Sequence, residues 1–141
     1  MKHTIYLFGF LCLTLFTGCQ NQVQQVTGSY SYKISGRGIV HGEERVLENE
    51  IGAMDIIRST DSTALVTFTA LRGPACHTYA TIQKRQIVLD AFERDVTFGT
   101  ADYHVTASGS GTIYENTIII CLKYEGTILS ADSLELLCKR N

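Results

Sequence analysis

From residue 26 onward, hydrophobic and polar residues alternate with a period of two along much of the chain. The first such segment, residues 29–34, reads Ser-Tyr-Ser-Tyr-Lys-Ile. Because successive side chains of a strand point to opposite faces, this alternation predicts half-buried β-strands. No long segment shows the 3.6-residue apolar spacing of an amphipathic helix. The pattern therefore predicts an all-β chain.

Further runs rich in β-branched and aromatic residues predict more strands. They cover residues 45–51, 53–58, 64–71, 76–84, 87–93, 103–108, 112–124 and 127–138. Turn-forming residues separate many of the runs, at 36–38, 60–62, 73–74, 98–99 and 125–126. A short helix is an alternative at residues 43–51, where strand or loop is favoured, and at residues 131–137.

Eight or nine short strands joined mostly by tight turns predict an antiparallel up-and-down meander. A sheet of that size has to deal with its unpaired edges, and closing into a barrel removes them. Gly109 and Gly111 interrupt the alternation, as expected at a bulge or a sharply coiled corner. We predict a small closed β-barrel, with a two-sheet β-sandwich as the alternative.

The N-terminal region has the features of an export signal. Polar residues at 2–3 precede an apolar run over residues 5–16, which is too short to span a bilayer as a lasting helix. The run closes with Leu15-Phe16-Thr17-Gly18-Cys19. This arrangement resembles a bacterial lipoprotein signal, in which the cysteine receives a diacylglyceryl group and becomes residue one. The resemblance implies a signal peptide over 1–18, a lipidated Cys19, a membrane anchor and a place in the cell envelope.

Residues 19–25 are expected to be the lipidated cysteine and a short polar tether, equivalent to a frayed terminus. By analogy with enteric bacteria, where aspartate after the cysteine retains lipoproteins in the inner membrane, Gln20 favours the outer membrane, facing periplasm or cell surface. Residues 26–141 then form a single domain with one modest core. The formal net charge is −2, and charges of both signs are interspersed, so no nucleic-acid partner is expected.

Three cysteines lie beyond the signal region, at positions 76, 121 and 138. Their number is odd and their spacing wide, which argues against a zinc cluster. In a tight hairpin centred on residues 125–126, Cys121 would face roughly Ala131 and not Cys138. Buried apolar thiols are therefore favoured over a Cys121–Cys138 bridge.

The candidate chemistry is sparse. The histidines at 41, 77 and 104 lie on separate runs without the spacing of common metal sites. Cys76 and His77 are neighbours on a predicted strand, so their side chains point to opposite faces and do not form a nucleophile pair. We expect no catalytic residues, metal or cofactor, and a binding protein instead of an enzyme.

The tyrosines are spread over several predicted strands. A tyrosine ring buries apolar area while its hydroxyl stays hydrated, which suits either the mouth of a cavity or an ordinary core. The candidates for contact with a small hydrophobic ligand are Tyr30, Tyr32, Tyr79 and Tyr103.

Two family resemblances bear on function. Thr27-Gly28-Ser29-Tyr30 opens the predicted domain, and the meander ends in a strand stopping at Lys139-Arg140-Asn141. In this layout the chain resembles small calycin-like, or lipocalin-like, barrel lipoproteins of Bacteroides-type bacteria. Lipocalins proper usually carry Gly-x-Trp near the first strand, whereas this chain has no tryptophan. The resemblance implies a barrel whose interior holds a small apolar molecule.

The second resemblance is local. Residues 108–114, Ser-Gly-Ser-Gly-Thr-Ile-Tyr, followed by Lys123, are similar to the Ser-Gly-x-x-Tyr and downstream lysine motifs of membrane-bound C-type lysozyme inhibitors. That motif implies a loop inserted into an enzyme cleft, with Ser110, Tyr114 and Lys123 as protein contacts. A structural glycine corner is the alternative. The sequence thus predicts a binding module for a small hydrophobic molecule or an envelope component, or alternatively a protein-binding enzyme inhibitor.

Overall fold

A computed structural model of the chain describes residues 22–141, apart from the side chains of residues 48 and 49. The predicted signal peptide, Cys19 and the start of the predicted tether lie outside the described residues. The elements are α1 (Gln22–Val26), β1 (Gly28–Val40), β2 (Glu43–Arg58), β3 (Thr63–Ala70), β4 (Cys76–Gln83), β5 (Gln86–Phe98), β6 (Ala101–Ile113), β7 (Thr117–Glu125) and β8 (Leu129–Arg140). Within 22–141, no helix has the length and apolarity needed to cross a membrane.

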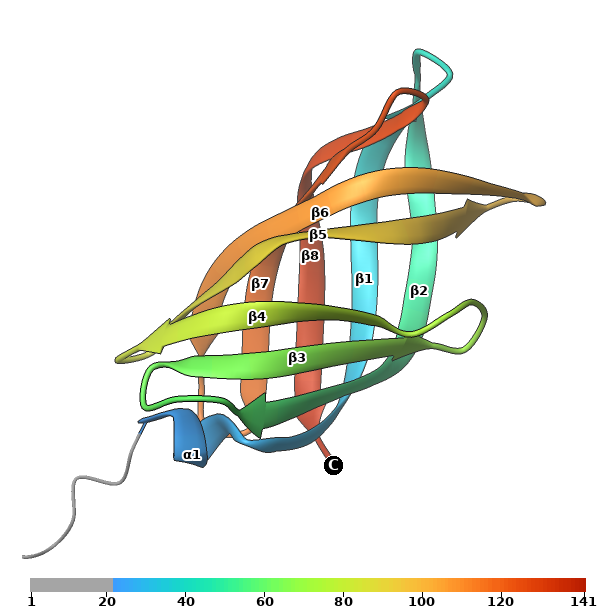
Figure 1. Cartoon of the computed structure of the whole chain (residues 1–141). Helices are drawn as coiled ribbons and strands as arrows, with labels where there is room; N and C mark the ends of the chain where they lie inside the picture. Colours follow the sequence, from blue (N-terminus) through green and yellow to red (C-terminus); the bar gives the residue numbers. More distant parts are fainter. Residues whose placement is uncertain (1–21) are drawn as a thin grey trace, which may run out of the picture.

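The eight strands form a closed antiparallel barrel in chain order (Figure 1). Each strand pairs with the next, and β1 also pairs with β8, which closes the sheet. Strand β7 shows the underlying pattern plainly, since its even-numbered residues 118–124 are buried and the odd-numbered residues between them are exposed. The predicted all-β meander and barrel are confirmed, and the sandwich alternative is wrong.

Bulges explain where the predicted strand boundaries were wrong. Residues 45–51 and 53–58 form one strand, β2, because the β1–β2 register shifts: Ile34 faces Glu50, but Gly36 faces Leu47. This irregularity changes which alternate residues of β2 point into the barrel. It therefore breaks the alternation in the sequence without ending the strand. The predicted turn at residues 36–38 likewise lies inside β1, and the turn follows at His41 and Gly42, which both have positive φ.

The two glycines predicted at a corner lie inside the continuous strand β6. The bulge is in the facing strand β5, between Leu89 and Phe92. A Cβ atom on Gly111 would lie 1.9 Å from the Ile119 carbonyl oxygen of β7, and one on Gly109 would lie 2.5 Å from the Cys121 carbonyl oxygen. Glycine is therefore needed here because β7 comes close to the backbone of β6.

The β7–β8 hairpin places the cysteines differently from the prediction. Cys121 faces Glu135 and not Ala131, because residues 126–128 lengthen the turn and the register shifts again between Leu122 and Tyr124. The three described cysteines are free. Cys138 is buried and Cys76 is half-buried. Cys121 is exposed on the outer face of β7, so the prediction of a buried thiol is wrong for this residue.

Helix α1 covers one end of the barrel, which we call the closed end (Figure 1). Val23 is 0% exposed. The Tyr30 hydroxyl donates to the Val26 carbonyl oxygen at 2.8 Å. Arg140 lies over the Tyr30 ring and donates to the Gln25 carbonyl oxygen at 2.6 Å. The described part of the predicted tether therefore belongs to the folded body.

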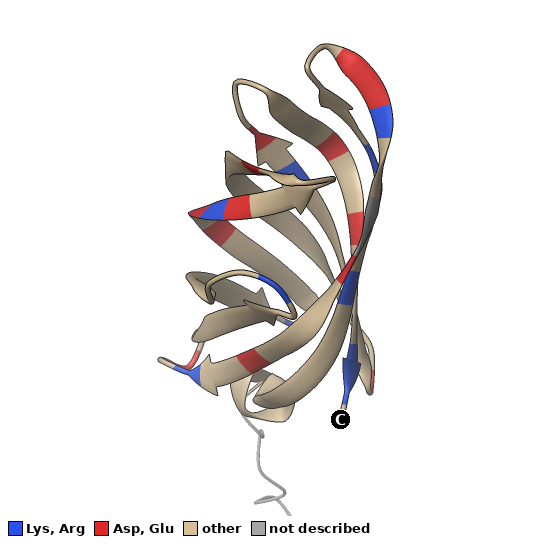
Figure 2. Ribbon diagram, turned by 90° about the vertical axis from the view of Figure 1, so that its right-hand side faces the viewer, with Lys and Arg blue, Asp and Glu red and all other residues tan. Residues whose placement is uncertain are grey.

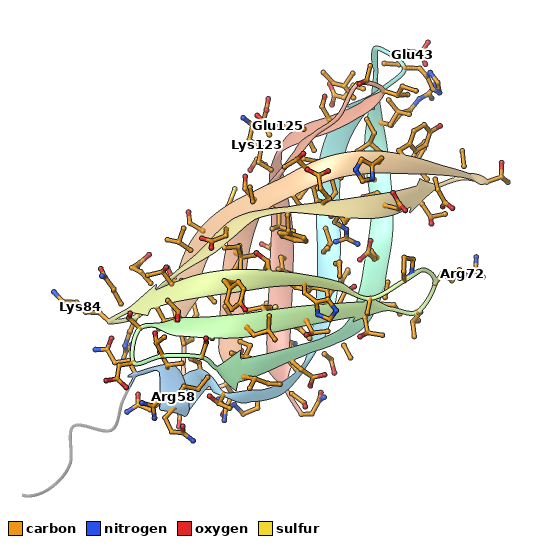
Figure 3. All side chains as sticks on the ribbon, in the orientation of Figure 1. Glu43, Arg58, Arg72, Lys84, Lys123 and Glu125 are labelled. Carbon is orange, nitrogen blue, oxygen red and sulfur yellow. The ribbon has the colours of Figure 1, made fainter. Side chains whose placement is uncertain are left out.

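The barrel wall is low on the side formed by β3 and β4. These strands have 8 residues each, against 16 in β2 and 13 in β5. The β2–β3 ladder involves only residues 52–58 of β2, and the β4–β5 ladder joins only residues 80–83 to residues 86–89. Residues 43–51 of β2 and 90–98 of β5 therefore have no ladder partner on this side. Figure 3 labels Arg72 in the β3–β4 connection that borders this gap.

Charged residues of both signs are interspersed over the strands and the hairpin ends (Figure 2). In Figure 3, Lys84 lies at the β4–β5 turn near the closed end, whereas Glu43 lies at the opposite end, which we call the mouth. The mouth includes the β1–β2, β3–β4, β5–β6 and β7–β8 connections.

Candidate ligand-binding site

Four polar side chains from four strands meet inside the barrel beside the low wall. We call them the interior polar cluster: Tyr32 of β1, Glu50 of β2, Arg94 of β5 and Tyr124 of β7. The Arg94 side chain is 5% exposed and that of Glu50 is 21% exposed. A charge that is 95% buried is unusual in a small barrel, because removing an ion from water is costly unless partners surround it.

Glu50 and Arg94 join the two strands that the low wall leaves apart. Arg94 Nη2 donates to Glu50 Oε1 at 2.6 Å, and the Tyr32 hydroxyl donates to the same oxygen at 2.8 Å. Arg94 Nη1 donates to the Tyr124 hydroxyl oxygen at 3.2 Å. The guanidinium carbon lies 5.7 Å from the centre of the Tyr124 ring, which adds a cation–π contact. An ionic contact thus spans a gap that no backbone ladder covers.

Three members of the cluster, Tyr32, Arg94 and Tyr124, keep their protons at neutral pH because their pKa values are raised. Burial raises the pKa of the Tyr32 hydroxyl, and the Glu50 carboxylate raises it further. Burial also raises the pKa of Tyr124. For Arg94, burial lowers the pKa, but the Tyr124 oxygen and the Glu50 carboxylate raise it above its ordinary value. The cluster therefore combines the Arg94–Glu50 ion pair with two neutral hydroxyl groups in the interior.

Aromatic packing and a glycine fix the position of Tyr32. Its ring packs edge-on against Phe68 with centroids 5.6 Å apart, and Phe68 stacks on Phe92 at 5.7 Å. A Cβ atom on Gly52 would lie 2.8 Å from the Tyr32 ring. Gly52 thus leaves room for the ring against β2, from which the hydroxyl reaches Glu50.

Two hollows open from the surface beside this cluster. The side hollow, of about 150 Å³, is lined by Ala70, residues 72–76, residues 93–95 and His104, and so includes the inward-facing Arg94. The rim hollow, of about 250 Å³, is lined by residues 50–51, residues 70–72, Asp95, Thr97 and Gly99. Both share Ala70, Arg72 and Asp95. Leu71, which is 74% exposed, and Ile51 give the rim hollow an apolar edge.

Another hollow, of about 500 Å³, lies beside α1 at the closed end. Its polar lining consists of exposed side chains such as Gln22, Lys84 and Glu115. Because its lining includes no member of the interior polar cluster, we do not assign the site there. Within residues 22–141, no three His, Cys, Asp or Glu side chains are placed to hold a metal ion.

The comparisons with known proteins support the fold. No protein-family model matches the sequence, and no curated protein matches it. The structure of EF1p2_mFAP2b bound to DFHBI is similar, with a TM-score of 0.55, 12% identity, and coverage of 86% of this chain and 98% of the other. A redesigned beta barrel, b11L5F_LGL, has a TM-score of 0.48 and 11% identity over 86% of this chain and 96% of the other. At such low identity, the first likeness shows a shared small-barrel fold.

The four tyrosines predicted to contact a ligand are not brought together. Tyr32 belongs to the interior polar cluster. Tyr103 is half-buried at the mouth, where its hydroxyl lies 3.3 Å from His41 Nε2. Tyr30 is buried under α1 at the closed end, and Tyr79 is 53% exposed on the outer face of β4. The candidate site therefore includes Tyr32, with Tyr103 elsewhere on the mouth.

The residues of the inhibitor-like motif do not form a loop. Ser110 lies within β6 and Lys123 within β7, both on the outer face, while Tyr114 lies in the connection between β6 and β7. Lys123 forms an ion pair with Glu125 at 2.5 Å, and Figure 3 shows these two labelled side chains close together. The geometry gives no inserted loop that carries all three residues.

Sequence reasoning missed Glu50, Arg94 and Tyr124 as members of a site. The alternation itself held a signal for Arg94, because this arginine occupies the inward phase between Phe92 and Val96. Glu50 is in phase with the buried residues Met54 and Ile56 of the same strand. A charged residue on the inward phase of a strand is the pattern that would have identified both.

Proposed function

We propose that this barrel is a binding module, not an enzyme, and that it takes up a small hydrophobic molecule beside the low wall. The observation that supports the proposal is the opening of interior groups to the surface: Arg94 and half-buried Cys76 line the side hollow, and Glu50 lines the rim hollow. In the side hollow, apolar residues such as Ala70, Pro74 and Ala75 lie beside polar groups fixed by ion pairs, and a small-molecule site combines these two features.

The dimensions limit the ligand to a small molecule. Inward side chains fill the core between the polar cluster and α1, including Met54, Ile56, Val66 and Ile118. An apolar cavity of about 150 Å³ holds a molecule of the size of benzene. The side hollow alone has that volume, and the adjoining rim hollow adds room for a substituent. The similar barrel EF1p2_mFAP2b was solved bound to DFHBI, which supports ligand binding by analogy of fold.

Filling the site from within should abolish binding. Ala70 is on the inward phase of β3 and lines both hollows, so the ring in Ala70→Phe would occupy them. We expect the Kd for α-methylstyrene, measured by NMR titration, to rise at least about tenfold because its volume is taken. The matched control is Thr69→Phe, which adds the same ring on the exposed outer face. Equal Kd values for the two variants would refute binding at this site.

We further propose that the protein is a lipoprotein of the cell envelope, held in the outer membrane through Cys19. The support comes from the signal-like sequence before Cys19. Helix α1 begins soon after this cysteine, at Gln22, and covers the closed end. A lipid on Cys19 would therefore hold the closed end toward the bilayer and leave the mouth facing away from it.

Lipidation should depend on Cys19 and not on the other cysteine of the N-terminal region. In the native host, we expect Cys19→Ser to eliminate the incorporation of labelled palmitate and to release the protein from the membrane fraction. Cys12→Ser is the control and should leave both unchanged, since Cys12 lies inside the apolar run. Membrane association that survives Cys19→Ser would contradict the proposed anchor.

A further inference from the structure

One donor of the buried guanidinium has no partner in the described part of the chain. Arg94 Nε is inaccessible to solvent and makes no hydrogen bond, whereas Nη1 and Nη2 donate to Tyr124 and Glu50. Leaving a buried donor of a charged group unpaired is destabilising, and native proteins seldom do so without a functional reason. The unpaired donor belongs to the side chain that lines the side hollow. An acceptor atom of a ligand that reached this nitrogen would pair the donor and remove the cost of leaving it unpaired.

The charges around Arg94 determine which kind of acceptor fits. Glu50 already neutralises the guanidinium. The lining of the side hollow adds Glu93 and Asp95 against one further arginine, Arg72. Glu93 and Asp95 point outward from β5 and pair with His104 at 2.8 and 2.9 Å. The carboxylates of Glu50, Glu93 and Asp95 already compensate the two arginines and His104, which leaves no excess positive charge among these residues for an anion, so a neutral acceptor is favoured.

The surroundings of Arg94 also select an apolar body. Phe92 precedes Arg94 on the same inward phase of β5 and stacks on Phe68, which faces Cys76 across the β3–β4 ladder. Burial raises the pKa of the Cys76 thiol, so it lines the hollow as a neutral, weakly polar group. The hollow itself has Ala70, Pro74 and Ala75 beside Cys76 in its lining, so one strong donor set next to these apolar groups suits a ligand with an apolar ring or chain and an exposed oxygen.

We propose that the ligand is a neutral apolar molecule carrying a carbonyl or similar acceptor oxygen, and that this oxygen accepts a hydrogen bond from Arg94 Nε. This inference rests on the proposed binding function and adds the chemical class of the ligand. Arg94 then has two roles, since its Nη atoms hold β2 and β7 while its Nε atom identifies the ligand.

The test compares three probes of nearly equal size and shape on the full chain. Acetophenone offers a neutral carbonyl, α-methylstyrene replaces the oxygen by a methylene group, and benzoate carries a charge. We expect acetophenone to bind with a Kd at least about tenfold lower than that of α-methylstyrene, because the hydrogen bond is made to a charged donor. Benzoate should bind no better than α-methylstyrene. In ¹⁵N NMR spectra, the Arg94 Nε–H signal should shift with acetophenone and stay in place with α-methylstyrene.

A conservative variant separates recognition from the structural role. Arg94→Lys keeps a cation beside Glu50 and Tyr124 but has no Nε donor. We expect this variant to bind acetophenone and α-methylstyrene equally, so that the ratio of the two Kd values falls from at least about ten to about one. If Arg94→Lys does not fold, the probe series and the Nε–H signal of the unaltered chain still decide the matter.

The outcomes distinguish the two proposals. Equal Kd values for acetophenone and α-methylstyrene, or tighter binding of benzoate, would overturn the class of ligand while leaving the binding function intact. An Arg94 Nε–H signal that is unmoved by bound acetophenone would do the same. If none of the three probes binds up to its solubility limit, the proposed function itself fails.

Discussion

Replacing Arg94 with methionine is expected to lower the free energy of unfolding by about 3 to 5 kcal/mol, because the change leaves a carboxylate without its partner in the interior. Glu50 loses the 2.6 Å contact with Arg94 Nη2, and only the Tyr32 hydroxyl still donates to Glu50 Oε1. Partial exposure of Glu50 places the expected loss toward the lower end of that range. The loss also removes the contact between β2 and β5 across the low wall.

Urea denaturation of the full chain measures this effect, and two further variants assign it. In Arg94→Met/Glu50→Gln the uncompensated charge is gone, so most of the lost stability should return. Lys123→Met removes a cation from an exposed ion pair with Glu125 and should leave the unfolding midpoint unchanged within error. If Arg94→Met unfolds at the same urea concentration as Lys123→Met, the interior ion pair does not hold the barrel together.

Gly111→Ala is the second substitution with a large expected effect, about 3 kcal/mol of lost stability. The added Cβ atom would lie 1.9 Å from the Ile119 carbonyl oxygen and 2.6 Å from the Ile120 Cα atom. Both are backbone atoms of β7, so no side chain can rotate away, and the β6–β7 ladder has to separate. The strain comes from the close approach of two strands and not from the conformation of Gly111 itself.

The neighbouring residue supplies the control for that experiment. Ser110→Ala changes an exposed side chain on the outer face of the same strand, and should alter the free energy of unfolding by no more than about 0.5 kcal/mol. Thermal unfolding followed by circular dichroism suffices to compare the two variants. A Gly111→Ala protein as stable as Ser110→Ala would mean that β7 lies farther from β6 than described.

The sequence predicts the architecture well because a barrel of alternating strands depends on local patterning. Period-two burial in β1, β4 and β7 follows directly from the alternation of large apolar and polar residues. The errors concentrate at the bulges, where one extra residue reverses the phase. The two predicted strands at 45–51 and 53–58 are the clearest case, since the alternation is broken there but the hydrogen-bonded ladder with β1 continues.

The candidate site is much harder to predict, because its members come together only when the barrel closes. Glu50 and Arg94 are separated by 44 positions in sequence and lie on strands that share no ladder. Tyr30 and Tyr32 are near neighbours on one strand, yet they lie at the closed end and in the polar cluster respectively. Alternation gives the face of a strand on which a residue lies, but not its height along the barrel axis.

The contact between Glu50 and Arg94 has a thermodynamic consequence for the whole barrel. This ion pair connects two strands that share no ladder, and its two side chains line the hollows that we assign to the ligand. Ligand binding and folding are then linked equilibria. A ligand that binds the native barrel and not the unfolded chain stabilises the folded state by mass action. The melting temperature should therefore rise as a larger fraction of the barrels carries a ligand.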